Sequence, residues 1–294
     1  MTVSRRTVRR VRGAGAAGAA AAGALPAQAR ERPRLPPDAK GLLYDSTLCI
    51  GCRACVTKCK QANELPPDAV QIMGATYDAP ADLNATTKTV IQLYQEGGQS
   101  AFVKRQCMHC VDPGCVTACM IHAFQKGPEG IISYDKSRCI GCRYCQIACP
   151  FNVPKFEWTK AVPQIVKCEL CRHRKEGPAC SEVCPRQAVI YGKTSDLLAD
   201  AKRRIAAQPK RYFPKVYGET DGGGTQCLYL APAGIPFGKL GLPDLGPEPV
   251  PDKAVSLQHG LYQGMVAPAV LYAALGFAVW RNRRKGQQGK EGGR

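Results

Sequence analysis

The chain has 294 residues and a formal net charge of +18. This length allows one or two domains with ordinary apolar cores, so scarce hydrophobic burial does not account for its seventeen cysteines. The basic excess lies largely at the ends of the chain. Residues 1–29 carry five arginines and no acid, and residues 281–294 carry six basic groups and one acid. The remaining residues, 30–280, have a net charge of +8. This distribution argues against a nucleic-acid interface, which needs basic groups gathered on a folded surface.

Residues 1–29 have the pattern of a cleavable export signal. The paired Arg5 and Arg6 precede an apolar, Ala/Gly-rich stretch over residues 13–25, and Ala27-Gln28-Ala29 supplies an A-x-A cleavage site. The paired arginines predict a twin-arginine signal, which exports proteins already folded and loaded with cofactors. The alternative is a disordered basic arm.

Residues 30–217 contain the main organising feature, a cysteine spacing repeated four times. Every quartet begins with C-x2-C and ends with C-x3-C, and only the middle gap varies. The quartets are Cys49, Cys52, Cys55 and Cys59; Cys107, Cys110, Cys115 and Cys119; Cys139, Cys142, Cys145 and Cys149; and Cys168, Cys171, Cys180 and Cys184. The segments 49–55 and 139–145 are almost identical, which indicates duplication of a ferredoxin unit.

This spacing predicts that the sixteen cysteines are the iron ligands of four [4Fe–4S] clusters. Three closely spaced thiolates on a tight loop reach three irons of one cube, and the fourth cysteine, carried away on a short helix, ligates the other cluster of a pair. Gly51 and Gly141 give the loops room to wrap the inorganic core. Each cluster with its four thiolates has a net charge of −2, so four would offset the +8 of the central region.

A disulfide scaffold and zinc sites are the alternatives. Seventeen is an odd number, and disulfides do not require a repeated C-x2-C-x2-C-x3-C spacing. Zinc uses pairs of C-x2-C, whereas three cysteines at two-residue gaps crowd a tetrahedral ion. The cluster interpretation is favoured over both.

The predicted fold class is α+β, with two ferredoxin-like units in tandem, two pseudo-symmetric cluster pairs and long loops. Short β-prone runs at residues 130–134 and 188–191 flank cysteine loops, and residues 195–207 form the one longer amphipathic helix. The last cysteine of each quartet is expected to open or sit on a short helix.

Residues 218–260 are rich in Gly and Pro and predict a linker and docking segment. Residues 261–280 form a charge-free, mostly apolar stretch of the length of a transmembrane helix. The basic residues 281–294 then predict a cytoplasmic tail, which places the cysteine domain on the periplasmic side of the inner membrane. A buried helix of a water-soluble domain is the alternative for residues 261–280.

No pattern of a reaction centre accompanies the cysteines. The cysteine-bearing region has no P-loop, no dinucleotide fingerprint and no nucleophile elbow. Its histidines are scattered, and a packed or surface role is the default for His109 and His173 inside the second and fourth quartets. The seventeenth cysteine, Cys227, has no partner spacing and is predicted to be a small buried residue. The chain is therefore expected to transfer electrons without catalysing a reaction of its own.

Several stretches outside the bare spacing resemble the four-cluster electron-transfer subunits of membrane-bound oxidoreductases, and most of all the hydrogenase 2 ferredoxin-like (HybA-like) subunits. They include Leu43-Tyr44-Asp45-Ser46-Thr47-Leu48-Cys49, Lys104-Arg105-Gln106-Cys107-Met108-His109-Cys110, Asn152-Val153-Pro154-Lys155, Lys167-Cys168-Glu169-Leu170-Cys171 and Gly222-Gly223-Gly224-Thr225-Gln226. Met120 departs from the pattern, because a family member often has proline after the fourth cysteine.

The resemblance implies a place between two partners. Such a subunit bridges the small and large subunits of a periplasmic nickel–iron hydrogenase and an integral membrane subunit that reacts with quinone. A relay attached to a molybdopterin oxidoreductase, of the formate dehydrogenase or polysulfide/DMSO reductase type, is the alternative. The resemblance also implies that quartet one shares its clusters with quartet four, and quartet two with quartet three, each triad taking the fourth cysteine of the other quartet.

Overall fold

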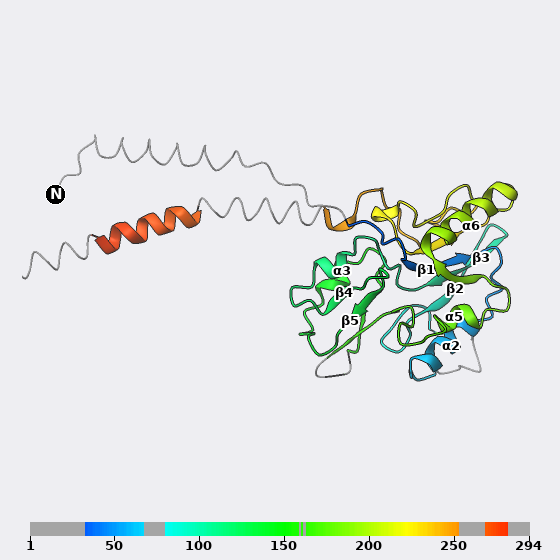
Figure 1. Ribbon diagram of the computed structural model, residues 1–294, viewed down its shortest axis with the longest axis horizontal. Coiled ribbons are helices and arrows are strands. Elements are labelled where there is room, and N and C mark those ends of the chain that lie inside the picture. The colour runs from blue at the N-terminus through cyan, green and yellow to red at the C-terminus, as the bar shows by residue number, and fades with distance from the viewer. Residues whose placement is uncertain (1–32, 68–79, 159, 161–162, 253–267, 282–294) are drawn as a thin grey trace, which may run out of the picture. The chain divides into compact units, whose positions relative to one another are not determined.

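The computed structural model describes residues 33–67, 80–158, 160, 163–252 and 268–281 (Figure 1). The chain divides into one compact unit, Arg32–Pro251, and a second formed by the terminal segments Met1–Glu31 and Asp252–Arg294. Within the second unit, the described residues beyond Asp252 form a helix over 268–281. The predicted signal of residues 1–29 lies outside the described residues, and so does the tail beyond residue 281.

A three-stranded sheet lies at the centre of the larger unit. The strands β1 (Lys40–Asp45), β8 (Val189–Lys193) and β9 (Cys227–Leu230) lie in the order β8-β1-β9. The middle strand β1 runs antiparallel to β8 and parallel to β9. Its residues are almost entirely buried because both faces are covered, which explains why it reads as a nearly continuous apolar run.

The helix α6 (Thr194–Ala207) follows β8 directly and packs on this sheet. Its apolar stripe, with Leu197 and Ala201 at helical spacing, joins Leu43, Leu228 and Leu230 of the strands in one core cluster. The helix predicted over residues 195–207 is thus confirmed to within one residue. The β-prone runs at 188–191 and 130–134 are confirmed as β8 and β5 (Ile132–Tyr134).

Three two-stranded hairpins complete the strands. β2 (Val90–Glu96) pairs with β3 (Gln99–Arg105), β4 (Phe124–Lys126) with β5, and β6 (Lys155–Phe156) with β7 (Ile165–Val166). The β2–β3 turn contains Gly97 and Gly98, both at positive φ, which is the requirement of a two-residue hairpin turn. The hydroxyl of Tyr44 on β1 donates to the carbonyl of Phe102 on β3 over 2.8 Å, so this hairpin is tied to the central sheet.

Each cysteine quartet contributes one short helix. These are α2 (Ala54–Ala62), α3 (Gly114–Thr117), α4 (Tyr144–Ile147) and α5 (Ala179–Glu182). The third cysteine of every quartet lies on its helix. The fourth lies on α2 in the first quartet and two residues beyond the helix in the other three, where the sequence predicted a helix at or after it. Helix α2 packs against α5 (Figure 1). Helix α3 packs against α4, so the first quartet faces the fourth and the second faces the third.

The α+β, ferredoxin-like part of the predicted fold class is confirmed, and its transmembrane helix is wrong. Of the predicted stretch 261–280, residues 261–267 lie outside the described residues, and a helix is described over residues 268–281. Among the helices of the described residues, none is sufficiently long and apolar to cross a membrane.

The segment after residue 217, where the composition predicts a linker, instead belongs to the compact unit as far as Pro251. It supplies β9, and the backbone N–H of Gln226 donates to the carbonyl of Met108 over 3.2 Å. Gly222, Gly223 and Gly224 all have positive φ around a short 3-10 helix, Asp221–Gly223. The glycines of this segment therefore serve tight turns inside the fold, a use that composition alone does not distinguish from a linker.

Candidate functional site

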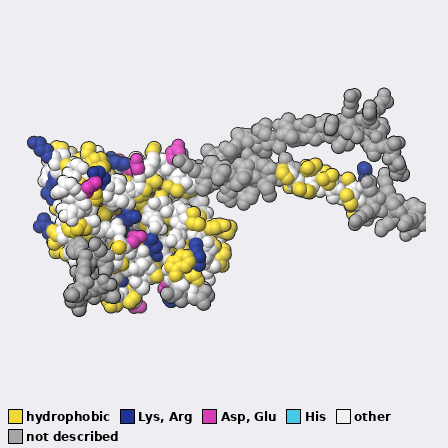
Figure 2. All heavy atoms as spheres, turned by 180° about the vertical axis from the view of Figure 1, so that it is seen from behind, with side chains coloured by type: hydrophobic (Ala, Val, Ile, Leu, Met, Phe, Trp, Pro, Cys, Tyr) yellow, Lys and Arg dark blue, Asp and Glu magenta, His cyan; other side chains and the backbone are white. Residues whose placement is uncertain are grey.

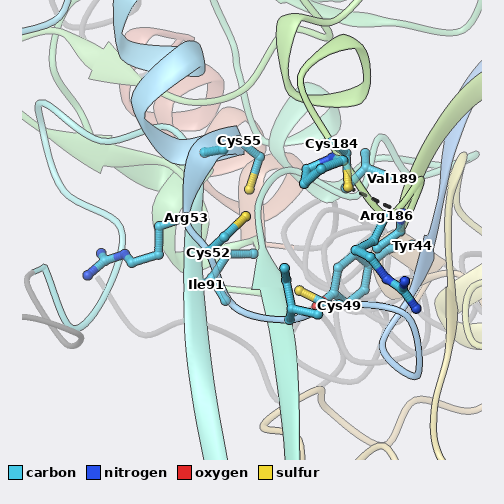
Figure 3. A pocket seen from close by; sticks show the side chains of 13 residues that line it. Tyr44, Cys49, Cys52, Arg53, Cys55, Ile91, Cys184, Arg186 and Val189 are labelled. Carbon is cyan, nitrogen blue, oxygen red and sulfur yellow. Dashed lines mark hydrogen bonds between the residues drawn. The ribbon is translucent and has the colours of Figure 1, made fainter.

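Three cysteines of the first quartet and the last cysteine of the fourth surround one pocket. Cys49, Cys52, Cys55 and Cys184 line it together with mostly apolar residues. Figure 3 shows these four side chains pointing toward one another, whereas Arg53 points away. We call these four residues the Cys49 set. The pairing of quartet one with Cys184 that the resemblance implies is the pairing that the structure brings together.

The other predicted ligands form three similar sets. The members of each set can be identified from the neighbouring cysteines that raise the pKa of one of its thiols. Burial is the first cause that raises the pKa of Cys59 to about 12, and the neighbouring Cys180 and Cys171 raise it further. Burial likewise raises the pKa of Cys110 well above its usual value, with Cys149, Cys107 and Cys115 adding to it. The pKa of Cys145 is raised to about 12 by burial and then by Cys139, Cys119 and Cys142. The Cys168 set comprises Cys168, Cys171, Cys180 and Cys59; the Cys107 set comprises Cys107, Cys110, Cys115 and Cys149; the Cys139 set comprises Cys139, Cys142, Cys145 and Cys119.

The backbone of the cysteine loops is built from left-handed residues at repeated positions. In the first loop Gly51 has φ 71° and Arg53 has φ 59°, and in the third Gly141 has φ 73° and Arg143 has φ 66°. The glycine adopts this conformation without cost, whereas the arginine has a Cβ and is held there by the fold. The similar angles at equivalent positions indicate that both loops wrap the same shape.

Backbone N–H groups point at several of the sulfur atoms. The N–H of Ala123 donates to Cys119 Sγ and that of Ala188 to Cys184 Sγ, each over 3.2 Å. In both cases the donor follows its cysteine by four residues, after a residue at positive φ, His122 or Gln187. Hydrogen bonds to cluster sulfurs are among the factors that set reduction potential, so these turns both hold the fourth cysteine and act on its electronic properties.

The donor sets fit [4Fe–4S] clusters and do not fit single metal ions. Each set offers four soft thiol ligands in mostly apolar surroundings, and the burial that raises their pKa values makes them poor thiolates unless a cation is bound. Within the described part of the chain, no three Cys, His, Asp or Glu side chains converge on a position for one ion. A cube spreads its four thiolates over four irons, so they surround a space and do not meet at a point.

Each of the four sets neighbours the next in a single order. Cys180 of the Cys168 set acts on the pKa of Cys55, and Cys107 acts on that of Cys168, so the Cys168 set lies between the Cys49 and Cys107 sets. Cys145 in turn acts on the pKa of Cys115. The order is therefore the Cys49, Cys168, Cys107 and Cys139 sets. Cys52 and Cys142, the exposed cysteines of the described residues, belong to the two terminal sets.

Apolar side chains are exposed beside the terminal sets. Ile140, Tyr144 and Ile147 next to the Cys139 set are 67%, 54% and 82% exposed, and Ile50 beside the Cys49 set is 55% exposed. The guanidinium of Arg143 stacks over Trp158, 4.0 Å from the ring centre. On the face in Figure 2, apolar and basic side chains intermingle over the folded unit. The described surface near each terminal set thus offers apolar contact area without a catalytic constellation.

Three residues singled out in the sequence have structural partners. His109 is completely buried, and its Nδ1 accepts a hydrogen bond from the N–H of Ile132 over 3.0 Å. Burial is the first cause that lowers its pKa well below the usual value, with Lys167 and Lys126 lowering it further, so the ring is neutral. His173 is exposed and hydrogen-bonds the carbonyl of Ala62 over 2.9 Å. Cys227 is buried as predicted, and its thiol donates to the carbonyl of Cys107 over 3.3 Å.

Sequence reasoning missed Lys104, a residue of β3 that is 0% exposed. Burial lowers its pKa, but the nearby Cys180, Cys55, Cys168 and Cys59 outweigh that effect and raise it overall. The available signal was a lysine within an apolar run of a strand, Ala101-Phe102-Val103-Lys104. A charge at such a position is buried only if the opposite charge meets it there.

Known proteins resemble this chain over most of its length. The model of the 4Fe-4S dicluster domain matches residues 99–194. The hydrogenase-2 operon protein HybA of Escherichia coli O157:H7 is 40% identical, over 88% of this chain and 89% of its own. The nitrate-inducible formate dehydrogenase iron-sulfur subunit of Escherichia coli K12 is 35% identical, over 76% of this chain and 78% of its own. The formate dehydrogenase iron-sulfur subunit of Haemophilus influenzae is 32% identical, over 81% of this chain and 77% of its own. The chain belongs to the HybA family of electron-transfer proteins with four [4Fe–4S] clusters.

Proposed function

We propose that this chain is the non-catalytic subunit that relays electrons between a periplasmic nickel–iron hydrogenase and an integral membrane subunit that reacts with quinone. The observation that carries the proposal is the single order of the four cysteine sets, with the exposed Cys52 and Cys142 in the two terminal sets. A relay needs an entry and an exit at its surface and a protected path between them. The higher identity and coverage of the match to HybA support hydrogenase as the partner.

The protein's own contribution is to hold and insulate the path. Bound [4Fe–4S] clusters take up and release single electrons. The middle sets lie in the core, where Cys168, Cys180 and Cys107 are all under 10% exposed, so solvent is kept from the interior of the path. The N–H groups of Ala123 and Ala188 fix the sulfur of the fourth cysteine in two sets. None of these groups needs to move or to exchange a proton with a substrate.

The exposed apolar residues at each end are the proposed contact points. The surface of Ile140, Tyr144 and Ile147 fits one partner, and that around Ile50 fits the other. The paired Arg5 and Arg6 support export by the twin-arginine route, and thus a location on the periplasmic side of the inner membrane. We infer that binding to the membrane subunit is what keeps the protein at that membrane.

The test is hydrogen-dependent quinone reduction in membranes of a strain that lacks this chain and is then supplied with it. The proposal predicts that activity with quinone is lost without the chain and restored with it, while hydrogen-dependent reduction of a soluble dye persists throughout. Restoration of formate-dependent quinone reduction in its place would assign the chain to a molybdopterin oxidoreductase. That outcome would overturn the choice of hydrogenase and keep the relay.

A further inference from the structure

Lys104 is a buried cation with an unusual shortage of partners. It lies on β3 with no exposed surface, and its ammonium donates to the hydroxyl of Thr89. In the part of the chain that the structure describes, no carboxylate forms an ion pair with it. A buried ammonium costs several kcal/mol unless an opposite charge faces it. Something other than an acidic side chain must therefore balance Lys104.

Other buried lysines of this fold are satisfied by backbone carbonyls. The ammonium of Lys60 donates to the carbonyls of Pro66 and Thr86, over 3.0 and 2.9 Å. The ammonium of Lys167 donates to the carbonyls of Ile132 and Cys168, over 2.5 and 2.9 Å. Lys104 differs because one neutral hydroxyl is its hydrogen-bond partner among the described residues. The charges that act on its ammonium are those of the thiols of Cys180, Cys55, Cys168 and Cys59.

These sulfur atoms belong to two adjacent cysteine sets. Of all neighbouring charges, that of Lys104 has the largest effect on Cys55, in the Cys49 set, and on Cys59 and Cys180, in the Cys168 set. Lys104 also lies directly opposite Ile91 in the pairing of β3 with β2, and Ile91 lines the pocket of the Cys49 set. The ammonium thus lies where the first and second sets of this order meet.

We propose that the ammonium of Lys104 is a fixed positive charge shared by the clusters of the Cys49 and Cys168 sets. This charge raises the reduction potentials of both clusters. Each cluster with its four thiolates gains one negative charge when it accepts an electron from its reductant, and it loses that charge when it passes the electron on. A nearby cation stabilises the more negative, reduced form. In the Cys107 and Cys139 sets, Lys104 is not among the leading charges that act on Cys110, Cys115 and Cys145. The proposal rests on the cluster content and holds for either catalytic partner.

The experiment is a redox titration of the full-length, cluster-loaded protein, followed by EPR, on the wild type and on Lys104→Met. Methionine keeps the length and the buried volume of the side chain and removes its charge. The equilibrium constant for reduction should fall at least tenfold for two clusters, which is about 59 mV for a one-electron couple. The other two clusters act as an internal reference and should not shift. Cys52→Ser and Cys142→Ser variants identify the signals of the Cys49 and Cys139 sets.

Two further variants separate charge from packing. Lys104→Arg retains the cation and should leave all four potentials close to those of the wild type. Thr89→Val removes the hydrogen-bond partner and retains the cation, so it should also have little effect on the potentials, whatever it does to the melting temperature. If Lys104→Met does not assemble, Lys104→Gln, whose amide can still donate to Thr89, takes its place. Unchanged potentials in an assembled neutral variant, or equal shifts in all four clusters, would overturn the proposal.

Discussion

Cysteine has two different roles in this chain, and the place of each cysteine in the fold indicates which role it has. Sixteen cysteines lie in the four sets, whereas Cys227 lies on β9, with its thiol donating to the carbonyl of Cys107. Gln106 also donates to Cys227 Sγ, over 3.5 Å. Cys227 is thus a neighbour of a predicted ligand and has its own hydrogen bonds. Its role is to pack and to hold the loop that carries Cys107.

Cys227→Ser is expected to leave the iron content unchanged and to lower the free energy of unfolding by about 1 kcal/mol, because a hydroxyl keeps the hydrogen bond and fills less space. The matched variant is Cys142→Ser, in the Cys139 set, which should lose one cluster, about four irons per chain. Iron analysis and thermal unfolding check both. An iron loss in Cys227→Ser as large as that in Cys142→Ser would show that Cys227 is a ligand.

Gly41 on β1 shows how closely the elements approach one another. A Cβ at this position would clash with the carbonyl of Gln226 and approach the hydroxyl of Thr194 to 2.8 Å. The backbone carbonyl of Gln226 cannot move away from an added Cβ as the end of a flexible side chain could. Gly41→Ala is therefore expected to cost about 1–3 kcal/mol of unfolding free energy, the range for overpacking a core.

The control for Gly41→Ala is Gly238→Ala, because a Cβ at Gly238 meets no atom within 4 Å. Its melting temperature should be within error of that of the wild type. An equal melting temperature for Gly41→Ala and Gly238→Ala would mean that β1 and β9 are not as close as described.

At the scale of elements, the packing of α2 against α5 brings the first and fourth quartets together. This packing predicts that Cys52 and Cys184, which are far apart in the sequence, serve one cluster. It also predicts that Cys52 and Cys59, which are near each other in the sequence, serve two different clusters. Spacing within a quartet predicts that cysteines are shared, but it does not say between which quartets. The helix pairs supply that information.

The pairing predicts non-additive losses of iron. Cys52→Ser combined with Cys184→Ser should lose no more iron than the larger of the two single losses, because both belong to the Cys49 set. Cys52→Ser combined with Cys59→Ser should lose the sum of the single losses, because two clusters are affected. Additive losses in the first pair, measured on purified full-length protein, would contradict the pairing.

The sequence predicts some helices and strands better than others. The helix α6 was predictable because its apolar stripe has helical spacing on a stretch free of cysteine. Strand β9 was not, because a four-residue strand among glycines and prolines has little pattern of its own and forms by pairing with β1. The apolar run at 261–280 predicted a membrane span, but among the described residues no helix is long and apolar enough to cross a membrane. The burial of Lys104 depends on sulfur atoms from three other segments and so was missed.

At the scale of the whole molecule, the fold is an arrangement for four cofactors in a single order. The core clusters contain predicted ligands among ordinary apolar residues, such as Cys55 beside Val56 and Cys145 beside Phe124 and Ile132. The short helices, of four residues in three cases, are too small to be stable alone. We therefore expect bound clusters to contribute much of the stability, as metal sites do in small metallodomains.

The central claim is that the four cysteine sets each hold one [4Fe–4S] cluster. Iron and acid-labile sulfide analysis of the anaerobically purified full-length protein tests it most directly, with zinc measured on the same sample. The account predicts about sixteen irons and about sixteen sulfides per chain, with little zinc. An iron count near four, or zinc in stoichiometric amount, would contradict it.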